Sequence, residues 1–200
     1  MHEIVESVRK FRKASKSKPT QKLGDTPTRF HIENMPRTKY MIIPCHSSEN
    51  REYIPFGYVD PKCLASNATL IAMDASLFTF GTLSSKMHKT WTKYVCGRLE
   101  SRYRYSAGVV YNNFPWPDPT PAQRKRIEEA AQNVLDVRDR YPDQSYADLY
   151  DPLTMPKDLL KAHQKLDKEV YKAYRDEAFK NDGERMSFLF EQYRQKIGIE

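Results

Sequence analysis

The sequence is divided by a stiff connector in which every second residue is a proline: Pro115, Pro117, Pro119 and Pro121. Proline fixes φ and has no backbone N–H, so this run neither continues a helix nor sits inside a sheet. Short apolar segments separated by polar loops precede the connector, whereas apolar residues at helical spacing follow it. These patterns predict an α+β chain, with a small mixed α/β domain at residues 1–116 and a helical domain of about three helices at residues 117–200.

The first part begins with a predicted basic amphipathic helix at residues 3–13, which Ser-rich residues 15–20 then break. We expect residues 15–20 to run as a strap over a surface. Runs rich in Ile, Tyr, Phe and Val predict short strands at residues 39–48, 52–60, 70–75 and 105–111. Apolar residues recur at helical spacing over residues 76–95, and Gly97 is placed to end that helix.

Helices are predicted throughout the second part. Thr120 and Gln123 flank Pro121 in the pattern of a capping box, which marks the start of the first helix. A second helix is expected from about Pro156 and a third after Asp182. Each has an apolar stripe, so the helices should pack against each other or against the preceding domain.

The net charge of +7 lies in the first part of the chain. Residues 1–40 hold 10 Lys and Arg against 4 Asp and Glu, whereas residues 117–200 hold 15 against 17. A basic part joined to a nearly neutral part indicates contact with a polyanion, although a solubilising surface would give the same charge. No apolar run is long enough for a membrane span and the N-terminus lacks a signal peptide, so we expect a cytoplasmic protein.

The strongest candidate for nucleic-acid contact is residues 98–114, where arginines are interleaved with tyrosines. Arginine suits bidentate contact with phosphate or guanine, and asparagine suits adenine. If residues 101–105 are extended, alternate arginines project on one side, but a surface strand with buried tyrosines would show the same pattern. The DNA-binding candidates of this region are Arg98, Glu100, Arg102, Arg104, Asn112 and Asn113, with Lys86 from the preceding helix.

Glu100 is informative because phosphate repels a carboxylate. Contact with cytosine, or the orientation of an arginine, explains a carboxylate among arginines better than backbone binding does. The alternative is a plain surface pair between Glu100 and Arg104 or Arg98.

A second candidate is the polar segment SSENR at residues 47–51, between two predicted strands. Its DNA-binding candidates are Ser48, Glu49 and Arg51, since Glu49 beside Arg51 offers an acceptor for cytosine N4 and a donor for guanine. An ordinary hairpin loop with a local ion pair is the simpler interpretation of the same residues.

No catalytic or metal-binding residue is assigned. The sequence has no G-x-G turn for a nucleotide or S-adenosylmethionine, and NNFPW at residues 112–116 lacks the first proline of the Asn-Pro-Pro-Tyr loop of adenine methyltransferases. His163 falls on an apolar helical face, which is typical of a core histidine. The cysteines, too widely spaced for a disulfide framework or a zinc site, are Cys45, Cys63 and Cys96.

Three parts of the sequence resemble the C-terminal third of MmeI-like DNA methyltransferases, type II restriction–modification enzymes in which one long chain methylates adenine. These parts are PCHSSENREYIPFGYVD, FGTLSSKMHKTWTKYVCGRLESRYRYSAGVVYNNFPWP and KAHQKLDKEVYKAYRD with ERMSFLFEQYRQK. The resemblance extends from about Val8 to Lys196. It implies a target recognition domain with a basic N-terminal arm at residues 1–116, followed by a helical C-terminal domain.

The resemblance also implies a function, namely sequence-specific recognition of double-stranded DNA for adenine-N6 methylation. The catalytic domain and the S-adenosylmethionine site would lie elsewhere in the same polypeptide, so this chain alone is expected to bind no cofactor and transfer no methyl group. The alternative function is that of a non-specific nucleic-acid (RNA) binding or interaction module, whose arginines contact phosphate only.

Overall fold

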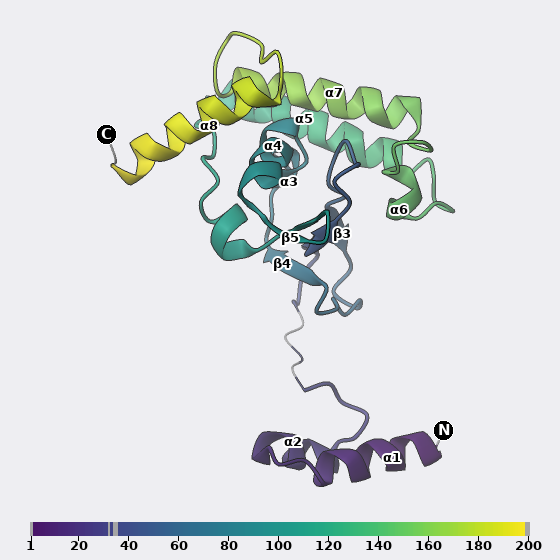
Figure 1. Ribbon diagram of the computed structural model, residues 1–200. Helices are drawn as coiled ribbons and strands as arrows, with labels where there is room; N and C mark the ends of the chain where they lie inside the picture. The colour runs from purple at the N-terminus through teal and green to yellow at the C-terminus, as the bar shows by residue number, and fades with distance from the viewer. Residues whose placement is uncertain (1, 32, 34–35, 199–200) are drawn as a thin grey trace. The chain divides into compact units, whose positions relative to one another are not determined.

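The computed structural model describes residues 2–31, 33 and 36–198, which fall into two compact units, residues 1–36 and 37–200 (Figure 1). The first unit contains α1 (His2–Lys13), α2 (Lys18–Lys22) and the short 3-10 helix η1 (Leu23–Asp25). The prediction of a basic amphipathic helix at residues 3–13 is therefore confirmed. The predicted strap at residues 15–20 is wrong from Lys18 onward, because a proline in the first helical turn starts α2.

Basic side chains of α1 hold the first unit together. Arg12 donates hydrogen bonds to the carbonyls of Leu23 at 3.2 Å and Thr26 at 3.1 Å. Arg9 donates to the carbonyl of Gly24, and Lys13 pairs with Asp25. Some of the basic side chains of this N-terminal arm therefore have partners within the arm itself.

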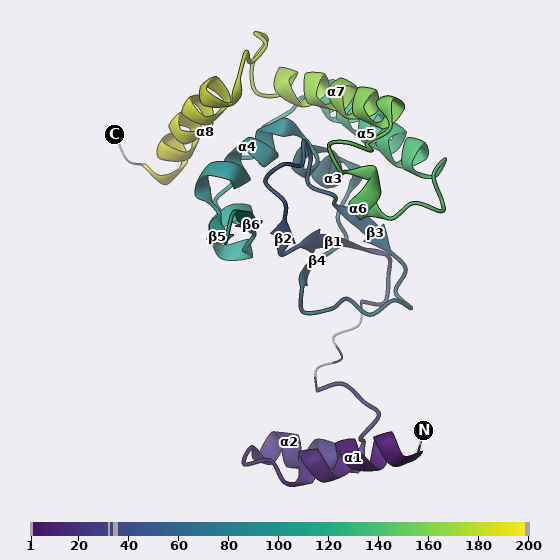
Figure 2. The same ribbon diagram turned by 45° about the vertical axis from the view of Figure 1, so that its right-hand side comes forward.

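The second unit contains two small antiparallel sheets (Figure 2). One has the order β3-β1-β4, built from β1 (Tyr40–Pro44), β3 (Gly57–Val59) and β4 (Thr69–Met73). The other has the order β2-β6-β5, built from β2 (His46–Ser47), β5 (Gly97–Leu99) and β6 (Arg102–Arg104). The strand predicted at residues 70–75 is confirmed over residues 70–73, since β4 ends at Met73. The strand predicted at residues 52–60 is extended and paired only from Gly57, and the one at residues 39–48 is divided at Cys45.

Helices form most of the remainder of this unit. They are α3 (Leu77–Leu83), α4 (Lys86–Val95), α5 (Pro121–Arg138), the short α6 (Tyr146–Leu149), α7 (Lys157–Lys172) and α8 (Asp182–Ile197). The capping box at Thr120 is present, and the three long C-terminal helices begin where the sequence predicts them. The short α6 was not predicted.

Two helix predictions before the connector need correction. The helix predicted at residues 76–95 is interrupted at Ser84 and Ser85, where extended backbone at Ser85 separates α3 from α4, and Gly97 begins β5 instead of capping the helix. The strand predicted at residues 105–111 is a π-helix, η2 (Ala107–Tyr111). A hydrogen bond from the Trp91 indole to the carbonyl of Val110, at 2.9 Å, holds this turn against α4.

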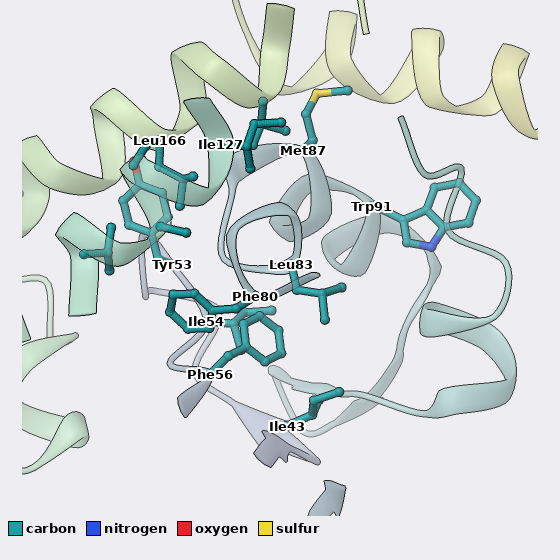
Figure 3. Close-up of a cluster of buried hydrophobic side chains, with 14 of the residues drawn as sticks. Ile43, Tyr53, Ile54, Phe56, Phe80, Leu83, Met87, Trp91, Ile127 and Leu166 are labelled. Atoms are coloured by element: carbon teal, nitrogen blue, oxygen red, sulfur yellow. The ribbon is translucent and has the colours of Figure 1, made fainter. Parts of the chain in front are cut away.

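One hydrophobic core joins the helices to the sheets. Helices α5 and α7 pack against each other and against α3, and a Cβ on Gly81 of α3 would lie 3.0 Å from Ala131 and 3.1 Å from Ile127. A side chain at this position would force Ala131 and Ile127 to shift, so glycine suits the close approach of α3 to α5. Figure 3 shows the resulting cluster, which contains residues from both sides of the proline connector. The division into domains at residues 116 and 117 stays a prediction.

Buried polar side chains of the C-terminal helices reach the segment that precedes β3. His163 is fully buried, stacks on Tyr53 with ring centroids 4.2 Å apart, and meets the Tyr150 hydroxyl at 2.7 Å. Burial, with the nearby charge of Arg138, holds the pKa of His163 well below its usual value. The prediction of a core histidine is confirmed. On the same helix, Asp167 accepts the Tyr53 hydroxyl at 2.7 Å.

Asp167 should make stability depend on pH. Burial raises its pKa from the usual 3.8 to about 6, while hydrogen bonds from the Lys86 backbone N–H and the Tyr53 hydroxyl oppose the shift. The Asp167 carboxyl group therefore binds a proton more tightly in the folded state than in the unfolded state. The contribution of Asp167 to the free energy of unfolding grows as the pH falls from above 6 towards 4. Each pKa unit corresponds to about 1.4 kcal/mol.

We predict that Asp167→Asn removes this gain in stability on acidification. The free energy of unfolding would be measured by urea titration across this pH range. Asp158→Asn is the matched control, because the Tyr141 hydroxyl lowers the pKa of Asp158 and gives that group the opposite pH dependence. An Asp167→Asn protein with the wild-type pH profile would contradict the assignment.

Candidate nucleic-acid interface

The candidate interface is built on the sheet β2-β6-β5. Strands β5 and β6 form a hairpin in which Leu99 faces Arg102 and Gly97 faces Arg104. In β6, Arg102 and Arg104 are exposed while Tyr103 between them is buried. The expected alternation is thus confirmed: both arginines project on the open side and the tyrosine anchors the strand.

The pairing of β2 with β6 brings together the two segments that sequence analysis singled out separately. Ser47 lies opposite Tyr103, so the segment that follows β2 runs beside the hairpin turn. The pKa of Glu49 is lowered by its own backbone N–H, by the Ser101 hydroxyl and by the charges of Arg98 and Arg102. Glu49 therefore faces the hairpin. The simpler interpretation of residues 47–51 included a local ion pair between Glu49 and Arg51. The described residues do not contain that ion pair.

The hairpin turn holds a second carboxylate among the arginines. Glu100 forms an ion pair with Arg102 at 2.7 Å, and not the pair with Arg104 or Arg98 that the sequence suggested. The Glu100 side chain is 76% exposed and its backbone has a φ of 57°. A non-glycine residue in this left-handed region is strained, and here it places an exposed carboxylate in the turn of the hairpin.

Three other candidates make hydrogen bonds or an ion pair within the chain. Arg98 donates to the carbonyls of Ser101 and Lys93, at 3.0 and 2.8 Å, and its guanidinium lies over the Tyr103 ring. Asn113 donates to two carbonyls of the π-helix. Lys86 pairs with Glu52 at 2.5 Å. These contacts hold the three side chains against other parts of the chain, and the contacts with nucleic acid assigned to them stay predictions.

Asn112 lies apart from this cluster. It is exposed at the end of the π-helix, in a groove lined by apolar residues of β1 and β4 such as Ile43, Ile71 and Met73. None of the hairpin residues lines that groove.

The segment at residues 47–51 borders a further groove that sequence analysis missed. Ser48, Asn50 and Arg51 line one part of a hollow of about 320 Å³, and the turn at residues 151–153 lines the other. In that turn Leu153 is 94% exposed. No local pattern in the sequence indicates that a turn of the C-terminal part lies beside a loop so far away along the chain.

The described residues contain no group of three His, Cys, Asp or Glu side chains that would hold a metal ion. Cys45, Cys63 and Cys96 are all free. None of the described helices is both long enough and apolar enough to cross a membrane.

Comparison with known families covers nearly the whole chain. Residues 1–118 match the family model described as "MmeI, target recognition domain", and residues 119–198 match "MmeI, C-terminal domain". This chain belongs to the MmeI family. Its first part is an MmeI target recognition domain and its second part an MmeI C-terminal domain, as the resemblance implied.

Two relatives illustrate the likeness to MmeI proteins. One is the structure of the Type IIL restriction–modification enzyme MmeI in complex with DNA, with 49% sequence identity and a TM-score of 0.88. The match covers 98% of this chain and 26% of the MmeI chain. DNA methyltransferase A of Bacillus subtilis (strain 168) is 40% identical over 195 residues, which cover 98% of this chain and 22% of that protein. The chain thus spans about a quarter of the length of these relatives.

The strained turn of this MmeI domain leads to a prediction on stability. Glycine adopts a positive φ without steric cost, so Glu100→Gly should raise the free energy of unfolding by up to about 1 kcal/mol, less the small contribution of an exposed ion pair. Ser101→Gly is the comparison in the same turn and should lower it, because glycine adds unfolded-state entropy there and the variant also loses the hydroxyl that acts on Glu49. Both would be measured by urea titration. A Glu100→Gly protein less stable than Ser101→Gly would show that the turn stores no strain.

Proposed function

We propose that this chain recognises the base sequence of double-stranded DNA through the end of the β2-β6-β5 sheet, on behalf of an adenine-N6 methyltransferase. The recognition surface consists of residues 47–51 and the β5–β6 hairpin. Arg102 and Arg104 supply forked donors suited to guanine, while Glu49 and Glu100 supply acceptors suited to cytosine N4.

The observation that carries the proposal is the position of the two carboxylates. A surface that bound phosphate alone would gain from arginine and lose from a carboxylate beside it. Here Glu100 pairs with Arg102, and Glu49 lies within the field of Arg98 and Arg102. An acidic group here can accept from a base or fix the orientation of an arginine, and these roles support base recognition over phosphate binding alone. A plain surface ion pair is the alternative that variants of the hairpin test.

The relatives support the biological setting. One is an enzyme of a restriction–modification system solved with DNA, and another is named a DNA methyltransferase. We place methyl transfer, with S-adenosylmethionine as the donor, in a catalytic domain elsewhere in the same polypeptide, since no G-x-G turn occurs in this sequence. A cytoplasmic location is part of the same proposal.

A binding comparison tests the function directly. Affinities of this chain for a panel of duplexes and for single-stranded RNA would be followed against salt concentration. We expect weak, salt-dependent binding to all of them, with a preference among the duplexes that persists as salt rises. Equal binding to every duplex and to RNA would overturn the proposal.

The positive charge of the arm should contribute affinity without sequence preference. Lys16→Ala combined with Lys18→Ala should flatten the plot of log K against log salt, by about 0.9 for each phosphate that the arm no longer neutralises. Lys161→Ala with Lys165→Ala, on the exposed side of α7, is the matched control and should leave the slope unchanged. A changed order of preferred duplexes in the arm variant would show instead that the arm contacts bases.

The hairpin should set the preference at one base pair. Replacing Glu100 and Arg102 by other polar pairs should change the base selected at one position from a random duplex pool, at a cost of about 1–3 kcal/mol for the original base pair. Exchange of the exposed Lys125 and Glu129 of α5 is the control and should leave the selected sequence unchanged. If the hairpin variants select the original sequence with uniformly lower affinity, these residues contact phosphate.

A further inference from the structure

Neither recognition segment is made rigid by its own sheet. Strands β2, β5 and β6 are two or three residues long, too short to hold a fixed position by hydrogen bonding between strands alone. Residues 47–51 continue into residues 52–56, which are not paired as a strand, and the hairpin follows directly from α4. The orientation of both segments therefore depends on what holds residues 52–56 and α4.

Residues 52–56 are held by the C-terminal helices. Tyr53 is fully buried, and its hydroxyl donates to Oδ2 of Asp167 at 2.7 Å. Its ring stacks on His163, one turn earlier in α7. Three residues after Tyr53, the carbonyl of Phe56 accepts a hydrogen bond of 2.6 Å from Arg138 of α5.

Helix α4 is held by the same carboxylate. Its N-cap residue, Ser85, makes no side-chain capping hydrogen bond. The backbone N–H of Lys86, the first residue of α4, instead donates to Oδ1 of Asp167 at 2.7 Å. A carboxylate in this position also interacts favourably with the dipole of the helix. Asp167 thus replaces the local cap that α4 lacks.

We propose that Asp167 is a positioning residue for DNA recognition, whose two carboxylate oxygens fix residues 47–51 and the β5–β6 hairpin relative to each other. One oxygen holds Tyr53, just after the first segment, and the other holds the start of α4, which leads into the second. The C-terminal domain would thereby determine sequence discrimination through a residue that is 4% exposed. This inference rests on the proposed function.

The cost of Asp167 supports a role beyond stability. A buried carboxylate loses its hydration, and its hydrogen bonds regain only part of that energy, so well-packed apolar residues often stabilise such a site better. Here the carboxylate meets two donors that belong to two separate segments. An apolar residue would fill the same space but would leave the two segments free to shift against each other.

Three substitutions separate the two connections. Tyr53→Phe removes the hydroxyl and retains the ring stacked on His163, so it breaks only the connection to residues 47–51. Lys86→Pro removes the backbone N–H at the first position of α4, where proline is well tolerated after an extended residue, and Lys86→Ala controls for removal of the lysine side chain. Asp167→Asn weakens both connections.

The matched control for Tyr53→Phe is Tyr141→Phe. The Tyr141 hydroxyl also donates to an aspartate of α7, Asp158, at 2.7 Å. Among the described residues, no hydrogen bond joins Tyr141 to residues 47–51 or to the β5–β6 hairpin. A loss of stability from removing a Tyr–Asp hydrogen bond is common to both variants. A change in sequence discrimination is expected only for Tyr53→Phe.

Discrimination would be measured at each base pair, with duplexes that carry single mismatches. Glu49→Gln and the Glu100 and Arg102 exchange first assign base pairs to the two segments. Tyr53→Phe should then reduce discrimination roughly tenfold, about 1.4 kcal/mol, at the base pairs of residues 47–51 only. Lys86→Pro, compared with Lys86→Ala, should reduce discrimination at the base pairs assigned to the hairpin. Asp167→Asn should reduce discrimination at the base pairs of both segments.

Amide hydrogen exchange provides an independent measurement on the free chain. Exchange should accelerate in residues 47–51 for Tyr53→Phe, in residues 97–104 for Lys86→Pro, and in both for Asp167→Asn, while unfolding remains cooperative. Unchanged discrimination and exchange in folded Tyr53→Phe and Asp167→Asn proteins would overturn the inference. A wild-type chain without any preference among duplexes would instead overturn the proposed function.

Discussion

The fold depends on a buried guanidinium, that of Arg138 at the end of α5, which is 4% exposed. It donates to the Tyr150 hydroxyl at 2.7 Å and to the Phe56 carbonyl at 2.6 Å, and the same hydroxyl meets His163 at 2.7 Å. A buried charge without partners costs several kcal/mol. Helices α5 and α7, the turn that contains Tyr150 and the backbone before β3 must therefore assemble together for this charge to be tolerated. The C-terminal helices and the recognition part are consequently parts of one core.

The sequence predicts best where local chemistry decides the structure. The capping box at Thr120 and the apolar periodicity of α5, α7 and α8 depend on neighbouring residues only, and these elements are found as predicted. The sequence predicts poorly where a contact with a distant residue decides the local structure. The helix over residues 76–95 is interrupted where Asp167 takes over the capping of α4, and the β-branched run before Tyr111 forms a π-helix held by Trp91. Neither partner is visible from local spacing.

The candidate site shows the same division. The chemistry of Arg102 and Arg104 follows from an alternating pattern and was predictable, since it needs only an extended backbone. Glu49 lies beside the hairpin because β2 pairs with β6. These two strands are far apart in the sequence, so local patterns do not predict their register. The use of Arg98 to hold the hairpin to α4 depends on the exact path of the turn. Residue types thus indicate a candidate surface, and tertiary pairing determines which of its side chains are left without partners inside the described part of the chain.

In the hairpin and the residue that follows it, the side chains that anchor the backbone differ from those proposed to contact DNA. Its inward residues, Tyr103 and Tyr105, are buried, and Tyr105 meets His88 of α4 at 2.9 Å. Its outward residues, Arg102 and Arg104, contribute little to the core, because exposed ion pairs and side chains add at most about 1 kcal/mol to stability. The outward positions can therefore change without loss of the fold, provided that the backbone beneath them stays fixed. The proposed recognition of bases requires that this backbone stays in one position, and the buried contacts with the C-terminal helices hold it there.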